Sequence, residues 1–186
     1  WTSAGKTIIA LLTGIAQKDG LLDINTSTSN YLSEAWTNTT PEQESMISLR
    51  HQLTMTSGLN DGVEDPYCTL DTCLVYLAEA DTRWAYHDGS YTLLRNVIEN
   101  ASGLGINNYT FQKLKSLISM NGVFVYEGYG GVFISTARSM TRFGLLILNE
   151  GQWNQNDILE DHVYYNAMIN TSQEHNKSYS YLWWLN

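Results

Sequence analysis

A serine and a lysine stand three residues apart near the beginning of the sequence, as Ser3 and Lys6. In a helix, residues with this spacing lie on one face within one turn, so the amine of Lys6 can reach the hydroxyl of Ser3. A free serine is a poor nucleophile, and a free lysine is protonated at neutral pH. The pair therefore needs surroundings that lower the lysine pKa, by burial, by nearby positive charge or by the positive end of the helix dipole. A neutral Lys6 would then serve as a general base for Ser3.

Two other interpretations of these residues stay open on the sequence alone. Serine is a preferred residue at the N-cap of a helix, and lysine is common on helix surfaces. Gly5-Lys6-Thr7 also matches the end of the phosphate-binding motif G-x-x-x-x-G-K-[ST], although the first glycine of that motif would fall before Trp1. Residues 144–150 would supply the metal-binding strand of such a nucleotide site, but they fit an apolar helix end equally well.

The elements that must position these residues are predicted to be mostly helices. Apolar residues at positions 8, 11, 12 and 15 have the spacing of one buried helix face directly after Lys6. Helical patterns recur in later segments, namely 47–54 with an end at Gly58, 70–80, 91–103, 108–119 and 136–149. Residues 60–67 and 81–90 are predicted to be loops. No run of strands long enough for a full sheet is predicted.

The composition is that of one globular domain with a sizeable core. The chain has 186 residues, of which 43% are hydrophobic and 16% charged. Its formal net charge is −9, and lysine and arginine do not cluster. Because proteins bind nucleic acids through positive surfaces, no nucleic-acid partner is expected. No apolar run is long enough to span a bilayer, so no integral membrane segment is expected.

Cys68 and Cys73 are the only cysteines, and four residues separate them. This spacing suits neither a zinc knuckle nor a C-x-x-C redox pair. A local disulfide would contribute roughly 2 kcal/mol through so short a loop. It would indicate an oxidising compartment, so that the protein would be periplasmic or secreted. Two unpaired buried thiols are the alternative. No cluster in the sequence has metal-ligand spacing, so neither a metal nor another cofactor is predicted.

The sequence becomes more specific at Tyr86-His87-Asp88, which lies before a predicted helix, 83 residues after Ser3 (86 − 3 = 83). Together with Ser3-Ala4-Gly5-Lys6, this segment resembles the serine β-lactamase and penicillin-binding protein superfamily. The resemblance is to the branch that includes class C β-lactamases, D-alanyl-D-alanine carboxypeptidases and related esterases. Three further segments resemble this branch: 50–59, 91–103 and 130–144. The resemblance implies an α/β (α+β) fold of the β-lactamase/transpeptidase type, of which this chain would hold mainly the helical part.

The resemblance also implies a role for each residue of these motifs. Ser3 would be the acylated nucleophile, and Lys6 would be the base that activates it. Tyr86 would pass a proton to the leaving group, with a tyrosine packed in a loop as the alternative. Asp88 stands at a substrate-binding position where the family has an asparagine. An amide can donate a hydrogen bond to the substrate there, whereas an ionised carboxylate can only accept one.

A Ser-His-Asp triad is a weaker interpretation of the same region. Of the four histidines, only His87 falls in the candidate site, and the family allows many residues at this position. Trp1 also stands where the motif G-x-S-x-G requires its first glycine.

The third family motif, K-T-G or H-x-G, has no candidate in this sequence, and neither do the strands expected before Ser3. Residues 1–186 are therefore expected to be a partial hydrolase domain. The strand with the third motif would supply one of two N–H groups of the oxyanion hole, and loss of one such donor typically costs on the order of a hundredfold in rate.

The resemblance implies acyl transfer through an acyl-Ser3 intermediate. The partner would be a small-molecule or peptide substrate, namely a β-lactam, a D-alanyl peptide or an ester. The alternative is a catalytically impaired relative that binds peptidoglycan-like ligands without turnover. Asp88 and the absent third motif favour this alternative. The oligomeric state is left open.

Overall fold

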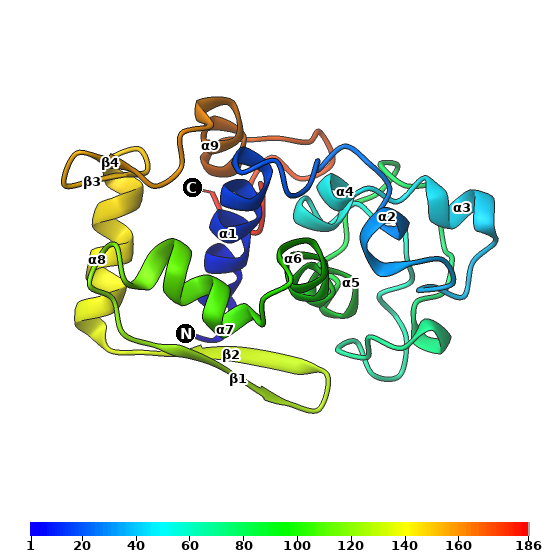
Figure 1. Ribbon diagram of the computed structural model, residues 1–186. Coiled ribbons are helices and arrows are strands. Elements are labelled where there is room, and N and C mark those ends of the chain that lie inside the picture. The colour runs from blue at the N-terminus through cyan, green and yellow to red at the C-terminus, as the bar shows by residue number, and fades with distance from the viewer. Residues whose placement is uncertain (186) are drawn as a thin grey trace.

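The core of the structure is built around helix α1 (Lys6–Lys18), which follows a short 3₁₀ turn, η1 (Thr2–Gly5). The computed structural model describes residues 1–185. In Figure 1, α1 runs through the middle of the molecule, with other helices on several sides of it. The predicted helix is confirmed, but its burial is not limited to one face, because every residue from 8 to 16 is buried. A helix that is apolar all round belongs in the interior of a domain.

Helix α9 (His162–Ile169) packs closely on α1. The hydroxyl of Tyr164 donates a hydrogen bond to the carbonyl oxygen of Ala10 at 2.7 Å. A Cβ atom at Gly14 would lie 2.4 Å from the Tyr164 ring, which is too close for any side chain. Gly14 is therefore required for this approach of the two helices.

The remaining elements are short and are joined by loops. The other helices and helical turns are α2 (Ser29–Leu32), α3 (Pro41–Ser45), α4 (Leu49–Leu53), η2 (Asp71–Cys73), α5 (Asp88–Thr92), α6 (Leu94–Ser102), α7 (Ile106–Thr110), the π-helical turn η3 (Phe111–Lys115) and α8 (Ala137–Leu148). The strands are β1 (Val123–Glu127), β2 (Gly130–Ile134), β3 (Gln152–Trp153) and β4 (Asn156–Asp157). Within residues 1–185 they form two antiparallel sheets of two strands each, β1–β2 and β3–β4. The predicted mixed α/β class, mostly helical and without a full sheet in this chain, is confirmed.

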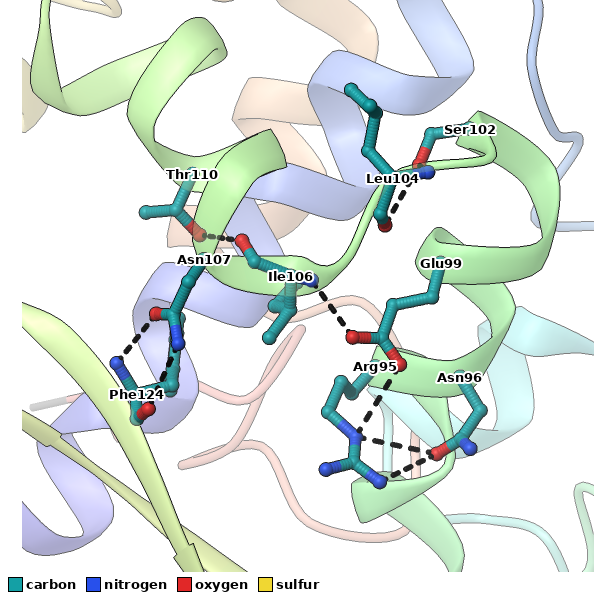
Figure 2. A network of polar contacts seen from close by, with 9 residues as sticks. All are labelled: Arg95, Asn96, Glu99, Ser102, Leu104, Ile106, Asn107, Thr110 and Phe124. Atoms are coloured by element: carbon teal, nitrogen blue, oxygen red, sulfur yellow. Dashed lines mark hydrogen bonds and ion pairs between the residues drawn. The ribbon is translucent and has the colours of Figure 1, made fainter.

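A network of polar contacts joins α6, α7 and β1 (Figure 2). Glu99 accepts a hydrogen bond from the backbone N–H of Ile106 at 2.7 Å, at the start of α7. The side-chain amide of Asn107 bonds both backbone groups of Phe124, donating to its carbonyl at 3.0 Å and accepting from its N–H at 2.8 Å. These bonds fix the β1–β2 hairpin against the helices. The hairpin in turn contacts η1. The backbone nitrogen of Trp1, which precedes η1, donates to the carbonyl of Phe133 at 2.8 Å.

A second, smaller core consists of Trp36, Ile47, Leu59 and Leu74. The side chain of Glu44 is buried beside it and accepts four hydrogen bonds. The donors are the backbone N–H groups of Ala35 and Thr37 and the hydroxyls of Ser29 and Thr37. One carboxylate therefore organises the loop between α2 and α3.

The helix predicted over residues 70–80 is wrong. Only η2 is helical there, and Val75 and Tyr76 form isolated β-bridges. Neighbouring backbone supplies hydrogen bonds here, since Asn38 donates to the carbonyl of Leu74 and Asn60 to that of Val75. These two carbonyl groups, which a helix would have paired internally, are thus paired with other segments of the chain.

Two boundaries also differ from the prediction. Helix α4 ends after Leu53, before Met55, which has a φ of 61°, rather than at Gly58. The helix predicted over 91–103 begins earlier and is divided at Leu93 into α5 and α6, although its predicted stop at Gly103 is confirmed by a φ of 69°. The helices predicted around 108–119 and over 136–149 are confirmed by α7, η3 and α8. No helix within residues 1–185 is both long enough and apolar enough to cross a membrane.

Helices α3 and α4 begin with the same reciprocal capping arrangement, but only the cap of α4 uses a side chain that titrates near neutral pH, His51. In α3, Thr40 and Gln43 bond each other's backbone N–H groups. In α4, Ser48 and His51 do the same, with His51 Nδ1 accepting from the N–H of Ser48 at 3.1 Å. Protonation of His51 would remove this acceptor.

We therefore expect acid to weaken the fold partly through His51. Burial, together with Arg50, lowers the pKa of His51 despite the opposing effect of Asp81. A histidine whose pKa is lower in the folded state stabilises the protein fully above its unfolded pKa of about 6.5, and this stability is lost as the pH falls below that value. His51→Gln should keep the cap, as Gln43 does in α3, and should reduce the loss of stability in urea unfolding between about pH 7 and about pH 5. An unchanged pH dependence in the variant would contradict this role.

Candidate active site

The ammonium group of Lys6 lies at the centre of the candidate site. Its Nζ atom donates to Asp88 Oδ1 at 2.8 Å, and both side chains are largely buried. The same nitrogen lies 4.9 Å from the centre of the Tyr86 ring and 4.6 Å from that of the Tyr91 ring. The structure thus brings together three of the predicted site residues, Lys6, Tyr86 and Asp88.

Two parts of the chain position these groups, the start of α1 and residues 86–91. Lys6 is the first residue of α1, and Asp88 is the first residue of α5. Tyr91 follows Asp88 by three residues in α5, so both side chains lie on the face turned toward Lys6. Tyr86 comes from the extended segment just before that helix. The sequence prediction missed Tyr91 as a site residue, although its spacing from Asp88 was a usable signal.

These neighbours determine the charge of Lys6. Burial by itself would lower the pKa of the ammonium group. Tyr91, Asp88 and Tyr86 act in the opposite direction and together raise the pKa of Lys6 above its ordinary value. Lys6 is therefore held as an ammonium in this arrangement, whereas a general base requires the neutral amine.

Ser3 lies in η1, in the turn directly before Lys6, and is exposed. It is not the N-cap residue of either helix, because Trp1 precedes η1 and Gly5 precedes α1, neither with a side-chain capping bond. The capping interpretation of Ser3 is therefore wrong. Within the described chain the Ser3 hydroxyl has no hydrogen-bond partner.

The ring of Tyr86 is part of an aromatic cluster beside the site. It stacks on Trp184 with 5.7 Å between ring centres and meets Tyr179 edge-on at 5.9 Å. Trp84 contacts the same two partners. Tyr86 is therefore packed in its loop, as the alternative interpretation expected, and it also lies against the Lys6 ammonium. Burial raises the pKa of Tyr179, so this residue stays a neutral phenol.

His87 does not take part in the site. Its ring is buried, and neither ring nitrogen has a hydrogen-bond partner within residues 1–185. Burial lowers the pKa of His87, so it is neutral in the folded protein. A Ser-His-Asp triad requires hydrogen bonds on both sides of the imidazole, and the described residues do not provide them.

A small cavity of about 20 Å³ adjoins Lys6, which is room for about one water molecule. Its walls come from α1, α5, α6 and the β1–β2 hairpin, and they include Tyr91, Arg95 and Tyr126. The guanidinium of Arg95 lies 4.1 Å above the centre of the Tyr126 ring. Arg95 thus places a second cation at the cavity that adjoins Lys6, a neighbour that the sequence prediction also missed.

The predicted disulfide is confirmed in the structure, where Cys68 is bonded to Cys73. The alternative of two unpaired thiols is therefore wrong. The nucleotide interpretation also loses its support, because residues 144–148 belong to helix α8 and form no strand.

The β-lactamase family model matches residues 1–186. The chain belongs to the β-lactamase family. This agrees with the resemblance that Ser3, Lys6 and the segment around Tyr86 indicate. None of the curated protein sequences compared with the chain matches it significantly.

Solved structures show the same fold at low sequence identity. A β-lactamase-like protein from Bacteroides dorei DSM 17855 is similar with a TM-score of 0.79 and 18% identity, over 98% of this chain and 64% of that one. A D-stereospecific amidohydrolase from Streptomyces sp. is 16% identical with a TM-score of 0.73, over 97% and 68% of the two chains. A penicillin binding protein from Bacillus halodurans is 16% identical with a TM-score of 0.73, over 98% and 68%. This β-lactamase family chain thus spans about two thirds of the length of these relatives.

Proposed function

We propose that the protein is a serine hydrolase that transfers the acyl group of its substrate to Ser3. Lys6 takes the proton from the Ser3 hydroxyl, and Tyr86 delivers a proton to the leaving group. The resulting acyl-serine is then hydrolysed by water. The substrate is a β-lactam, a D-alanyl peptide or an ester, and the chemistry of the whole protein is part of this proposal.

One observation carries the proposal. An exposed serine precedes, by one turn, a buried lysine whose ammonium lies between Tyr86 and Tyr91. A buried lysine beside a tyrosine, one turn after an exposed serine, offers the groups that a proton transfer from the hydroxyl would need. Membership of the β-lactamase family, and the amidohydrolase and penicillin binding protein among its structural relatives, support the same class of reaction. The disulfide supports a periplasmic or secreted location.

Covalent labelling tests the role of Ser3. Incubation with a fluorophosphonate or a penicillin should add one reagent-derived group to the intact mass, and peptide mapping should place it on Ser3. Ser3→Ala should abolish the adduct. Thr2→Ala, which removes the neighbouring exposed hydroxyl, should leave the adduct in place. An adduct that persists in Ser3→Ala would show that another residue is the nucleophile.

A second candidate function is favoured by the Lys6–Asp88 ion pair. A base that is held as an ammonium at 2.8 Å from a carboxylate is poorly suited to activate a serine at neutral pH. On this alternative, the protein binds peptidoglycan-like peptides without turnover. A D-alanyl-D-alanine peptide would then raise the melting temperature, while no reagent would label Ser3 at neutral or alkaline pH.

A further inference from the structure

We propose that the Cys68–Cys73 disulfide positions the Asp88 carboxylate against the Lys6 ammonium, through a backbone contact between residues 66–68 and Gly89. The inference rests on the proposed function, in which Lys6 is the general base, because it gives the disulfide loop an influence on the protonation of Lys6. Asp88 contacts Lys6 directly, whereas the disulfide acts on Lys6 only through Asp88.

The first step of the argument is the contact between the loop and α5. The backbone N–H of Gly89 donates to the carbonyl of Pro66 at 2.9 Å. A Cβ atom at position 89 would lie 2.3 Å from the carbonyl oxygen of Cys68, so only glycine allows this approach. Gly89 directly follows Asp88 in the first turn of α5. The loop backbone therefore packs on the residue next to the carboxylate.

The second step is the way in which this loop is held. Within residues 1–185, the hydrogen bond from Gly89 to Pro66 is the one that joins residues 63–73 to a distant segment of the chain. The other hydrogen bonds of this loop link near neighbours, such as the N–H of Cys68 and the carbonyl of Asp65. Leu74, next to Cys73, is fully buried in the second core, and its carbonyl accepts from Asn38 at 3.0 Å. The disulfide thus ties the half of the loop that contacts Gly89 to the half that is anchored in the core.

The third step concerns the charges around Lys6. The groups that face it are Asp88 and Tyr91 from α5, Tyr86 from the preceding segment, and Arg95 from α6 across the shared cavity. Asp88 is the anion among them. Opening the disulfide frees residues 66–68 from the core anchor and removes the support behind Gly89. When the Asp88 carboxylate is held less closely to Lys6, it stabilises the ammonium less, and the pKa of Lys6 falls.

The experiment compares the oxidised protein with the same protein after reduction by a phosphine, and with the double variant Cys68→Ser/Cys73→Ser. Alkylation followed by mass spectrometry verifies that both thiols are free. NMR of protein labelled with ¹³C at the lysine ε carbons reports deprotonation of Lys6, followed from about pH 9 upward and past the ordinary lysine pKa of about 10.4. Reduction and the double variant should each lower the Lys6 pKa by about one unit or more, and the alkaline limb of Ser3 labelling should move to lower pH by the same amount.

Two further variants make the test specific. Gly89→Ala leaves both cysteines in place but forces residue 89 away from Cys68, so it should lower the Lys6 pKa in the oxidised protein. In an Asp88→Asn background, reduction should have no further effect, because the group through which the disulfide acts is gone. The phosphine should leave the double cysteine variant unchanged.

An unchanged Lys6 titration after verified reduction would overturn the inference, and so would an equal effect of reduction in Asp88→Asn. The Lys6 titration does not depend on turnover. If Ser3 is never labelled in any variant, the proposed function fails, while the titration still decides whether the disulfide positions Asp88.

Discussion

Asp88→Asn should speed acylation of Ser3 at neutral pH by about tenfold or more. Asp88 is the carboxylate that contacts the Lys6 ammonium, at 2.8 Å, and both side chains are mostly shielded from water. A close opposite charge commonly shifts a pKa by about 1 to 3 units, and each unit changes the fraction of neutral amine tenfold. The asparagine would also restore an amide that can donate a hydrogen bond to a substrate.

The measurement is the rate of fluorophosphonate labelling as a function of pH. The alkaline limb of the profile should move to lower pH in Asp88→Asn. Asp19→Asn is the matched control, because Asp19 also pairs with a lysine, Lys113 at 2.7 Å, but does so beyond the other end of α1. This control should leave the profile in place. A slower reaction or an unmoved profile in Asp88→Asn would mean that Asp88 does not restrain Lys6, and it would remove one support of the binding-only alternative.

Glu44→Ala should lower the free energy of unfolding by about 3 kcal/mol or more, because it leaves buried donors without an acceptor. Two of the donors are the backbone N–H groups of Ala35 and Thr37, each 2.9 Å from a carboxylate oxygen. Such groups cannot turn away to water without moving the loop that carries them. The loss should be visible in the urea midpoint, with a slope close to that of the wild type.

A control variant and a conservative variant test whether the loss of stability comes from the buried acceptor of Glu44. Glu42→Ala removes an exposed carboxylate from the same helix and should change the midpoint little. Glu44→Gln keeps one acceptor oxygen and should fall between the wild type and Glu44→Ala. If Glu44→Ala were no less stable than Glu42→Ala, the loop between α2 and α3 would have to obtain its stability elsewhere.

The sequence predicted the components of the site better than their charges. The spacing of Ser3 and Lys6 and the position of Tyr86 before a helix are local signals. The structure places Tyr86 and Asp88 around the Lys6 ammonium, whereas the role of Ser3 stays a prediction. The pairing of Asp88 with Lys6 depends on where α5 packs against α1, which no local pattern records. The raised pKa of Lys6 follows from that packing, so this arrangement does not meet the condition of a lowered lysine pKa that base catalysis requires.

The helices of the fold also differ in whether local sequence or contacts with distant segments determine them. The helical pattern over 136–149 was sufficient to predict α8, because the spacing of its apolar residues is a local signal. The structure adds a local cap, Thr136, which accepts from the N–H of Ser139. Residues 70–80 have a helical pattern as well, but their backbone pairs with Asn38 and Asn60, which are remote in sequence. For α1, the apolar spacing indicated one buried face, whereas contact with α9 and other helices covers the remaining sides.

The burial of residues 8–16 of α1 determines which part of the site can move. Amide protons in the middle of such a helix exchange with solvent only when the whole domain opens. Lys6 extends from the first turn of this rigid element, whereas Asp88 and Tyr86 belong to a short helix and to the loop before it. Slow motions of the site should therefore move the Asp88 carboxylate and the Tyr86 ring, while the backbone that carries Lys6 stays in place. Relaxation-dispersion signals should be concentrated in residues 86–91, with α1 silent on the same timescale.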